Sequence, residues 1–135
     1  MRSVAPLILA AALASCSTAP PPPSANFNGQ RQVGQWLAGL VPGAPVSCLS
    51  SFHQKEMAIA DDSTVAFRAA PGHVWVQKTQ SPCSPLAGPG PYALVTHSTV
   101  GSLCRGDIAT VVDTASGMNV GSCVMGDFIP YSRPR

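Results

Sequence analysis

The chain has 135 residues and a formal net charge of +2, and only 10% of its residues are charged, against 14 prolines and 12 glycines. This length suits one small domain and leaves no room for a second. The Lys and Arg residues stand singly, so the chain lacks the basic patch that binding to nucleic acid requires. The composition therefore predicts a single loop-rich domain and excludes a nucleic-acid partner.

The first 16 residues have the layout of a bacterial lipoprotein signal. Arg2 precedes a short apolar segment, residues 4–14, and small residues lead up to Cys16. This segment is shorter than the roughly 20 residues that span a bilayer as a helix. We therefore expect a signal peptide over residues 1–15 and a lipidated Cys16, whose acyl chains anchor the protein to a membrane. The alternative is cleavage after Ala14, which would release a soluble periplasmic or secreted protein.

The number of cysteines supports lipidation. Five cysteines are an odd number for an exported protein, but lipidation of Cys16 leaves four that can pair fully: Cys48, Cys83, Cys104 and Cys123. Ser17, in place of an aspartate, resembles the pattern that sends Gram-negative lipoproteins to the outer membrane. We therefore expect the protein in the cell envelope, at the periplasmic face of the outer membrane.

Residues 16–28 are predicted to be the lipidated cysteine and a tether. This segment is polar and contains four consecutive prolines, residues 20–23, which favour extended polyproline II structure. Residues 29–135 would then form one small domain, which contains β-strands and disulfides and begins with a helix.

The start of this domain has the pattern of an amphipathic helix over residues 29–40. Four apolar residues lie at helical spacing on one face: Val33, Trp36, Leu37 and Leu40. The Val-Pro-Gly sequence at residues 41–43 would end the helix. Because so short a helix is marginal alone, we expect its apolar face to cover one end of the core.

From residue 46 onward the apolar residues recur with a period of two, separated by turn residues. We predict strands over residues 46–52, 56–60, 64–68, 73–79, 92–98, 107–113 and 119–128. Turns are expected at residues 61–63, 71–72, 105–106 and 116–117. The proline-rich segment 81–91 can hold neither a helix nor a ladder. The predicted fold is mainly β, a small antiparallel meander that closes fully or partly into a barrel, with one N-terminal helix and two disulfides.

The spacing of the four later cysteines contains no C-x-x-C, so zinc-site and thioredoxin-like patterns are absent. Structural disulfides are the expected state in an oxidising compartment. The sequence permits three connectivities. We predict Cys48 with Cys123, which would join the first and last strands of a closed sheet, and Cys83 with Cys104, which would fix the proline-rich loop.

Several short runs occur around these cysteines: residues 62–67, 83–86, 103–107 and 123–128. The most specific are the L-C-x-G-D run that contains Cys104 and the C-x-x-G-x-F run that begins at Cys123. Together the runs resemble a family of small exported proteobacterial proteins of unknown function. The resemblance covers about residues 46–130. It implies a fold and an envelope location but assigns no catalytic residue.

The candidate catalytic and metal-binding residues are few. His53, His73 and His97 have no metal-site spacing, and we interpret them as solvated or capping residues. Neighbouring Asp61 and Asp62 would point to opposite faces of a strand, so bonding within a turn is the better interpretation. No residue is therefore predicted to be catalytic, and no metal or cofactor is predicted.

Two further short motifs have plain structural interpretations. The Arg-Gly-Asp run at residues 105–107 is expected to form a tight turn in which Asp107 bonds locally. The Gly-Ser-Cys run at residues 121–123 lies in a predicted strand, whereas a hydrolase nucleophile would sit on a strand-to-helix turn. Neither motif therefore predicts an activity.

The expected function is that of a lipid-anchored binding or structural module of the envelope. Its partner would be another envelope protein, peptidoglycan or a small apolar molecule in the barrel mouth. The alternative is a small hydrolase or metal-dependent enzyme that uses one of the three histidines with Asp62 or Asp107. Thiol redox chemistry is a third possibility, and it would require a free cysteine.

Overall fold

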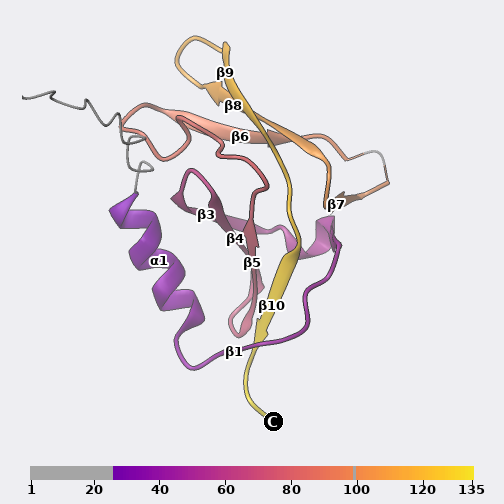
Figure 1. Ribbon diagram of the computed structural model, residues 1–135. Coiled ribbons are helices and arrows are strands. Elements are labelled where there is room, and N and C mark those ends of the chain that lie inside the picture. Colours follow the sequence, from indigo (N-terminus) through magenta and orange to yellow (C-terminus); the bar gives the residue numbers. More distant parts are fainter. Residues whose placement is uncertain (1–25, 99) are drawn as a thin grey trace, which may run out of the picture.

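The computed structural model describes residues 26–98 and 100–135, so the predicted signal peptide, Cys16 and most of the tether lie outside the described residues. The described part contains three antiparallel sheets and one helix, α1 (Figure 1). No helix in this part is long and apolar enough to cross a membrane.

Helix α1 (Phe27–Leu37) begins and ends two to three residues earlier than predicted. Asn26 caps it, because its side-chain oxygen accepts a hydrogen bond from the Gly29 N–H at 3.0 Å. The chain leaves the helix through Gly39, whose positive φ of 74° suits a residue just beyond a helix end. The predicted apolar face is confirmed, since Val33 and Trp36 are buried.

The largest sheet has five strands in the order β1-β10-β5-β4-β3. Its strands are β1 (Val41–Pro42), β3 (Glu56–Asp61), β4 (Thr64–Ala70), β5 (His73–Lys78) and β10 (Phe128–Ser132). One face packs on α1 through the small side chains of Ala58, Ala60 and Ala66. Small residues let the helix approach closely, and the main chain at Gly29 lies directly over Ile59.

Two smaller sheets cover the opposite face. They are a three-stranded sheet of β6 (Tyr92–Thr96), β8 (Ile108–Asp113) and β9 (Asn119–Val124), and a two-stranded sheet of β2 (Cys48–Ser50) and β7 (Ser102–Cys104). A 3-10 helix, η1 (Ser51–His53), follows β2. The main core lies between these sheets and the large one, with Leu49, Val111 and Phe128 fully buried in it. Figure 1 shows α1 on one side of the large sheet, β7 on the other side, and the three-stranded sheet across the upper end.

The fold is mainly β, as predicted, but the barrel is not formed, because none of the three sheets in the described part closes on itself. The predicted strand over residues 119–128 is divided between β9 and β10, which belong to different sheets. Gly126 lies at this division, and a Cβ atom there would stand 2.0 Å from the carbonyl oxygen of Lys78. The chain therefore passes from one sheet to the other at a residue that must be glycine.

All four cysteines of the domain form disulfides, as predicted, but the predicted pairing is wrong. Cys48 is bonded to Cys104 and Cys83 to Cys123. Cys48 and Cys104 are directly opposite each other in the β2-β7 ladder, whereas Cys123 lies in the three-stranded sheet. The prediction failed because it assumed one closed sheet in which the first and last strands are neighbours.

Candidate functional site

The three histidines belong to different segments of the structure. His53, in η1, stacks on Trp75 with ring centroids 4.4 Å apart and ring planes 18° apart. His73 begins β5 and His97 follows β6, and both are exposed. Within residues 26–98 and 100–135, no three His, Cys, Asp or Glu side chains form a group that could hold a metal ion.

The two neighbouring aspartates have different structural roles. Asp61 accepts a hydrogen bond from the Ser63 N–H at 2.7 Å, as the turn interpretation predicted. Asp62 instead points inward and is 2% exposed. Its carboxylate accepts hydrogen bonds from the Ala87 N–H at 2.7 Å and from the Ser84 hydroxyl at 2.9 Å. Asp62 therefore holds the proline-rich loop against the end of β3, and no hydrogen bond in the described part joins it to a histidine.

The Arg-Gly-Asp run forms the tight turn that the sequence predicted. Gly106 has a positive φ of 91°, and Asp107 accepts a hydrogen bond from the Cys104 N–H at 2.7 Å. The side chain of Arg105 contacts Asp127 at 3.4 Å in an exposed ion pair. Ser122 lies within β9, as predicted. These residues stabilise the turn and the strand and show no arrangement for catalysis.

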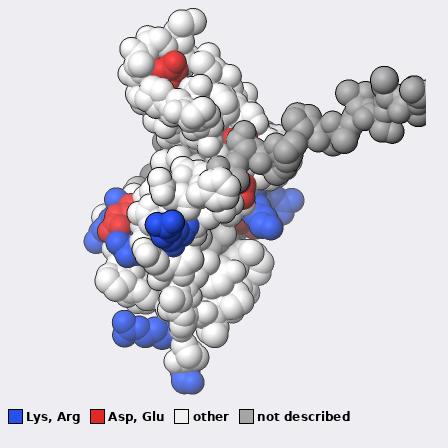
Figure 2. Space-filling view, turned by 90° about the vertical axis from the view of Figure 1, so that its left-hand side faces the viewer, with Lys and Arg blue, Asp and Glu red and all other residues white. Residues whose placement is uncertain are grey.

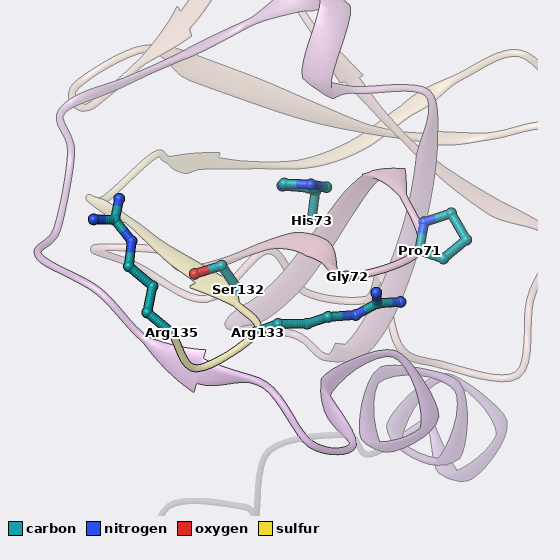
Figure 3. Close-up of a pocket in the computed structure, with 6 residues that line it drawn as sticks. All are labelled: Pro71, Gly72, His73, Ser132, Arg133 and Arg135. Atoms are coloured by element: carbon teal, nitrogen blue, oxygen red, sulfur yellow. The ribbon is translucent and has the colours of Figure 1, made fainter.

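A pocket of about 350 Å³ opens where the β4–β5 hairpin meets the residues after β10. Six residues line it: Pro71, Gly72, His73, Ser132, Arg133 and Arg135 (Figure 3). The antiparallel register of β5 and β10 places His73 opposite Ser132, so the last residues of the chain run beside the hairpin turn. We refer to this site as the basic pocket.

The turn that forms one wall of the basic pocket depends on Gly72. This residue has a positive φ of 84°, which L side chains rarely adopt. A Cβ atom there would also lie 3.2 Å from Nε of Arg133. The Arg133 side chain therefore runs along the turn toward Pro71, while Arg135 extends along the opposite side and His73 lies between them (Figure 3).

The side chains that line the basic pocket are cationic or neutral. Two arginines and a histidine contribute to it, and no Asp or Glu does. The two ion pairs among the described residues, Arg68 with Glu56 and Arg105 with Asp127, involve neither of its arginines. On the face shown in Figure 2, the lower end of the molecule carries Lys and Arg side chains without an acidic neighbour. The pocket therefore suits an anionic ligand.

The sequence does not predict this pocket, because its two walls are about 60 residues apart in the chain. Arg133 and Arg135 stand singly in the sequence and follow the last strand that was predicted. Only the pairing of β10 with β5 brings them to the hairpin.

Comparison with known proteins identifies no relative of this chain. No protein-family model matches the chain, and neither a curated protein nor a solved structure matches it significantly.

Proposed function

We propose that this chain is a lipid-anchored module of the bacterial cell envelope, and that it works by binding a partner. The main support for this proposal is that two disulfides account for all four cysteines of the domain. Cys16 is the fifth cysteine of the sequence, and it stands at the position where a lipoprotein signal requires its lipidated residue. Disulfides also fit an oxidising compartment outside the cytoplasm.

Binding is favoured over catalysis because both candidate carboxylates and one of the three histidines already have structural roles. Asp62 and Asp107 accept backbone hydrogen bonds, and His53 is stacked on Trp75. The basic pocket, by contrast, is open and offers charged groups to a ligand. The proposed partner is another envelope protein or peptidoglycan. A small apolar molecule in a barrel mouth is not proposed, because no sheet among the described residues closes.

Cell fractionation tests the anchor. The wild-type protein should be found with the outer membrane, and the Cys16→Ser variant should be found in the soluble periplasmic fraction. The matched control is the double variant Cys48→Ser and Cys104→Ser, which loses two thiols outside the signal and should stay with the membrane. Soluble wild-type protein, or a Cys16→Ser variant that stays with the membrane, would contradict the proposal.

A further inference from the structure

We infer that the basic pocket binds a small anion that carries a phosphate group. This inference deepens the proposal that the chain works by binding, but it does not depend on the membrane anchor. The two proposals can therefore fail separately.

The positive charge of the pocket favours a ligand with a negative charge. Arg133 and Arg135 each bring a guanidinium group to the pocket, and the part of the chain that the structure describes places no carboxylate side chain against either of them. Two guanidinium groups without acidic partners attract anions and have hydrogen-bond donors to offer them.

The polar groups of the pocket select phosphate among anions. A guanidinium group presents a planar fork of N–H donors that matches two oxygens of one phosphate. The hydroxyl of Ser132 lies on the floor between the arginines and can donate a further hydrogen bond (Figure 3). His73 lies opposite Ser132 in the ladder and adds a ring N–H. These donors come from β5 and from the chain at the end of β10, and they line one pocket, with the two guanidinium groups at its opposite sides (Figure 3).

The size of the pocket indicates a small ligand. Its volume of about 350 Å³ lies at the lower end of the range for small-molecule sites, roughly 300–1,000 Å³. This space accepts a phosphate together with a short polar group, such as a glycerol unit. Such a group occurs both in free phosphate esters and in the headgroups of anionic lipids.

Titration of the full-length protein, purified from membranes in a zwitterionic detergent, tests the inference. Inorganic phosphate, glycerol phosphate and glycerophosphoglycerol are added separately while the backbone amide signals are followed by NMR. We expect saturable shifts at the amides of Gly72 and His73. A stronger response to the diester glycerophosphoglycerol would identify a lipid headgroup as the source, and a stronger response to the other two would identify a free phosphate compound.

A pair of double variants separates this site from general charge. Arg133→Gln with Arg135→Gln should weaken the affinity at least about tenfold, or about 1.4 kcal/mol. The control, Arg31→Gln with Arg105→Gln, removes the same charge outside the pocket and should change the affinity less than about twofold, since exposed charges interact weakly. An absence of shifts at Gly72 and His73 with all three compounds, or equal weakening by the two double variants, would overturn the inference.

Discussion

The carboxylate of Asp62 and the backbone N–H of Ala87, 25 residues apart in the chain, form a buried hydrogen bond of 2.7 Å. The Asp62 carboxylate also accepts a hydrogen bond from the Ser84 hydroxyl, and the main-chain carbonyl oxygen of Asp62 accepts one from the Cys83 N–H. One residue at a hairpin turn therefore holds the loop that carries half of the Cys83–Cys123 disulfide.

Replacement of Asp62 should consequently destabilise the protein strongly. Asp62→Ala leaves a buried N–H and a hydroxyl without their acceptor, and we expect a loss of about 2–4 kcal/mol in the free energy of unfolding. Asp61→Ala, which removes one partly buried hydrogen bond within the turn, should cost about 1 kcal/mol. Urea unfolding monitored by tryptophan fluorescence measures both, and equal losses would contradict the assigned role of Asp62.

Two glycines of α1 should respond to alanine in opposite directions. A Cβ at Gly29 would lie 1.7 Å from the Ile59 carbonyl oxygen, so Gly29→Ala must push the helix off the sheet and should cost about 2 kcal/mol or more. Gly34 faces open space, and Gly34→Ala should stabilise the protein by about 0.5–1 kcal/mol through helix propensity. Thermal unfolding followed by circular dichroism checks the pair. If Gly29→Ala proved as stable as Gly34→Ala, the close contact of helix and sheet would be wrong.

Gln77 is fully buried beside Val65 and Phe128, and neither polar atom of its side chain has a hydrogen-bond partner among the described residues. Because an unpaired buried polar group costs about 1–3 kcal/mol, Gln77→Met should raise the free energy of unfolding by about 1 kcal/mol.

Gln80→Met is the matched control, since the Gln80 amide donates to the Met125 carbonyl at 2.8 Å. This variant should lower stability by about 1 kcal/mol. Chemical denaturation of both proteins provides the comparison. Destabilisation of Gln77→Met would show that its amide does have a partner in solution.

The two disulfides should differ in their rate of reduction. Cys83 and Cys123 are buried, at 0% and 2% exposure, whereas Cys48 is exposed. Since exchange requires access to a sulfur, dithiothreitol should open Cys48–Cys104 first under native conditions. Timed alkylation followed by peptide mass analysis gives the order, and earlier labelling of Cys83 or Cys123 would contradict the assigned burial.

Loss of either disulfide should still be costly at equilibrium. The bridges join cysteines 56 and 40 residues apart, and loops of these sizes correspond to about 4 kcal/mol each in the chain-entropy model. Cys48→Ala with Cys104→Ala therefore tests the loop contribution alone, because this bridge lies at the surface. Equilibrium urea unfolding gives the value, and a loss below about 1 kcal/mol would contradict that contribution.

Much of the β structure followed from local pattern. The predicted strands at residues 56–60, 64–68 and 73–79 agree with β3, β4 and β5 to within one or two residues. Their alternation of apolar residues is strong because one set of side chains faces the main core and the other faces α1. The predicted turns at residues 71–72, 105–106 and 116–117 contain glycines with positive φ.

The strands that were missed have no clear local pattern. β1 and β7 contain two and three residues, too few for a period to be recognised. β10 contains Pro130, which argues against a strand inside a sheet. In the structure the Pro130 carbonyl oxygen accepts a hydrogen bond from the Gly43 N–H. The Pro130 nitrogen, which has no hydrogen to donate, therefore also faces the side of the short edge strand β1. The proline is tolerated because the pairing on that side has nearly ended.

The candidate site could not be predicted for a related reason. Its residues are ordinary in sequence, and their meeting depends on which strands become neighbours. The same dependence explains the wrong disulfide pairing, because the partner of Cys48 is set by the pairing of β2 with β7. Local periodicity carries no information on either choice.

Mass analysis of the protein purified from membranes and alkylated without reduction tests the central claim, that a disulfide-bonded module is anchored through Cys16. We expect the added mass of acyl chains on Cys16, no alkylated cysteine, and linked peptides that join Cys48 to Cys104 and Cys83 to Cys123. An alkylated or unmodified Cys16, or alkylation of any of the other four, would contradict the account.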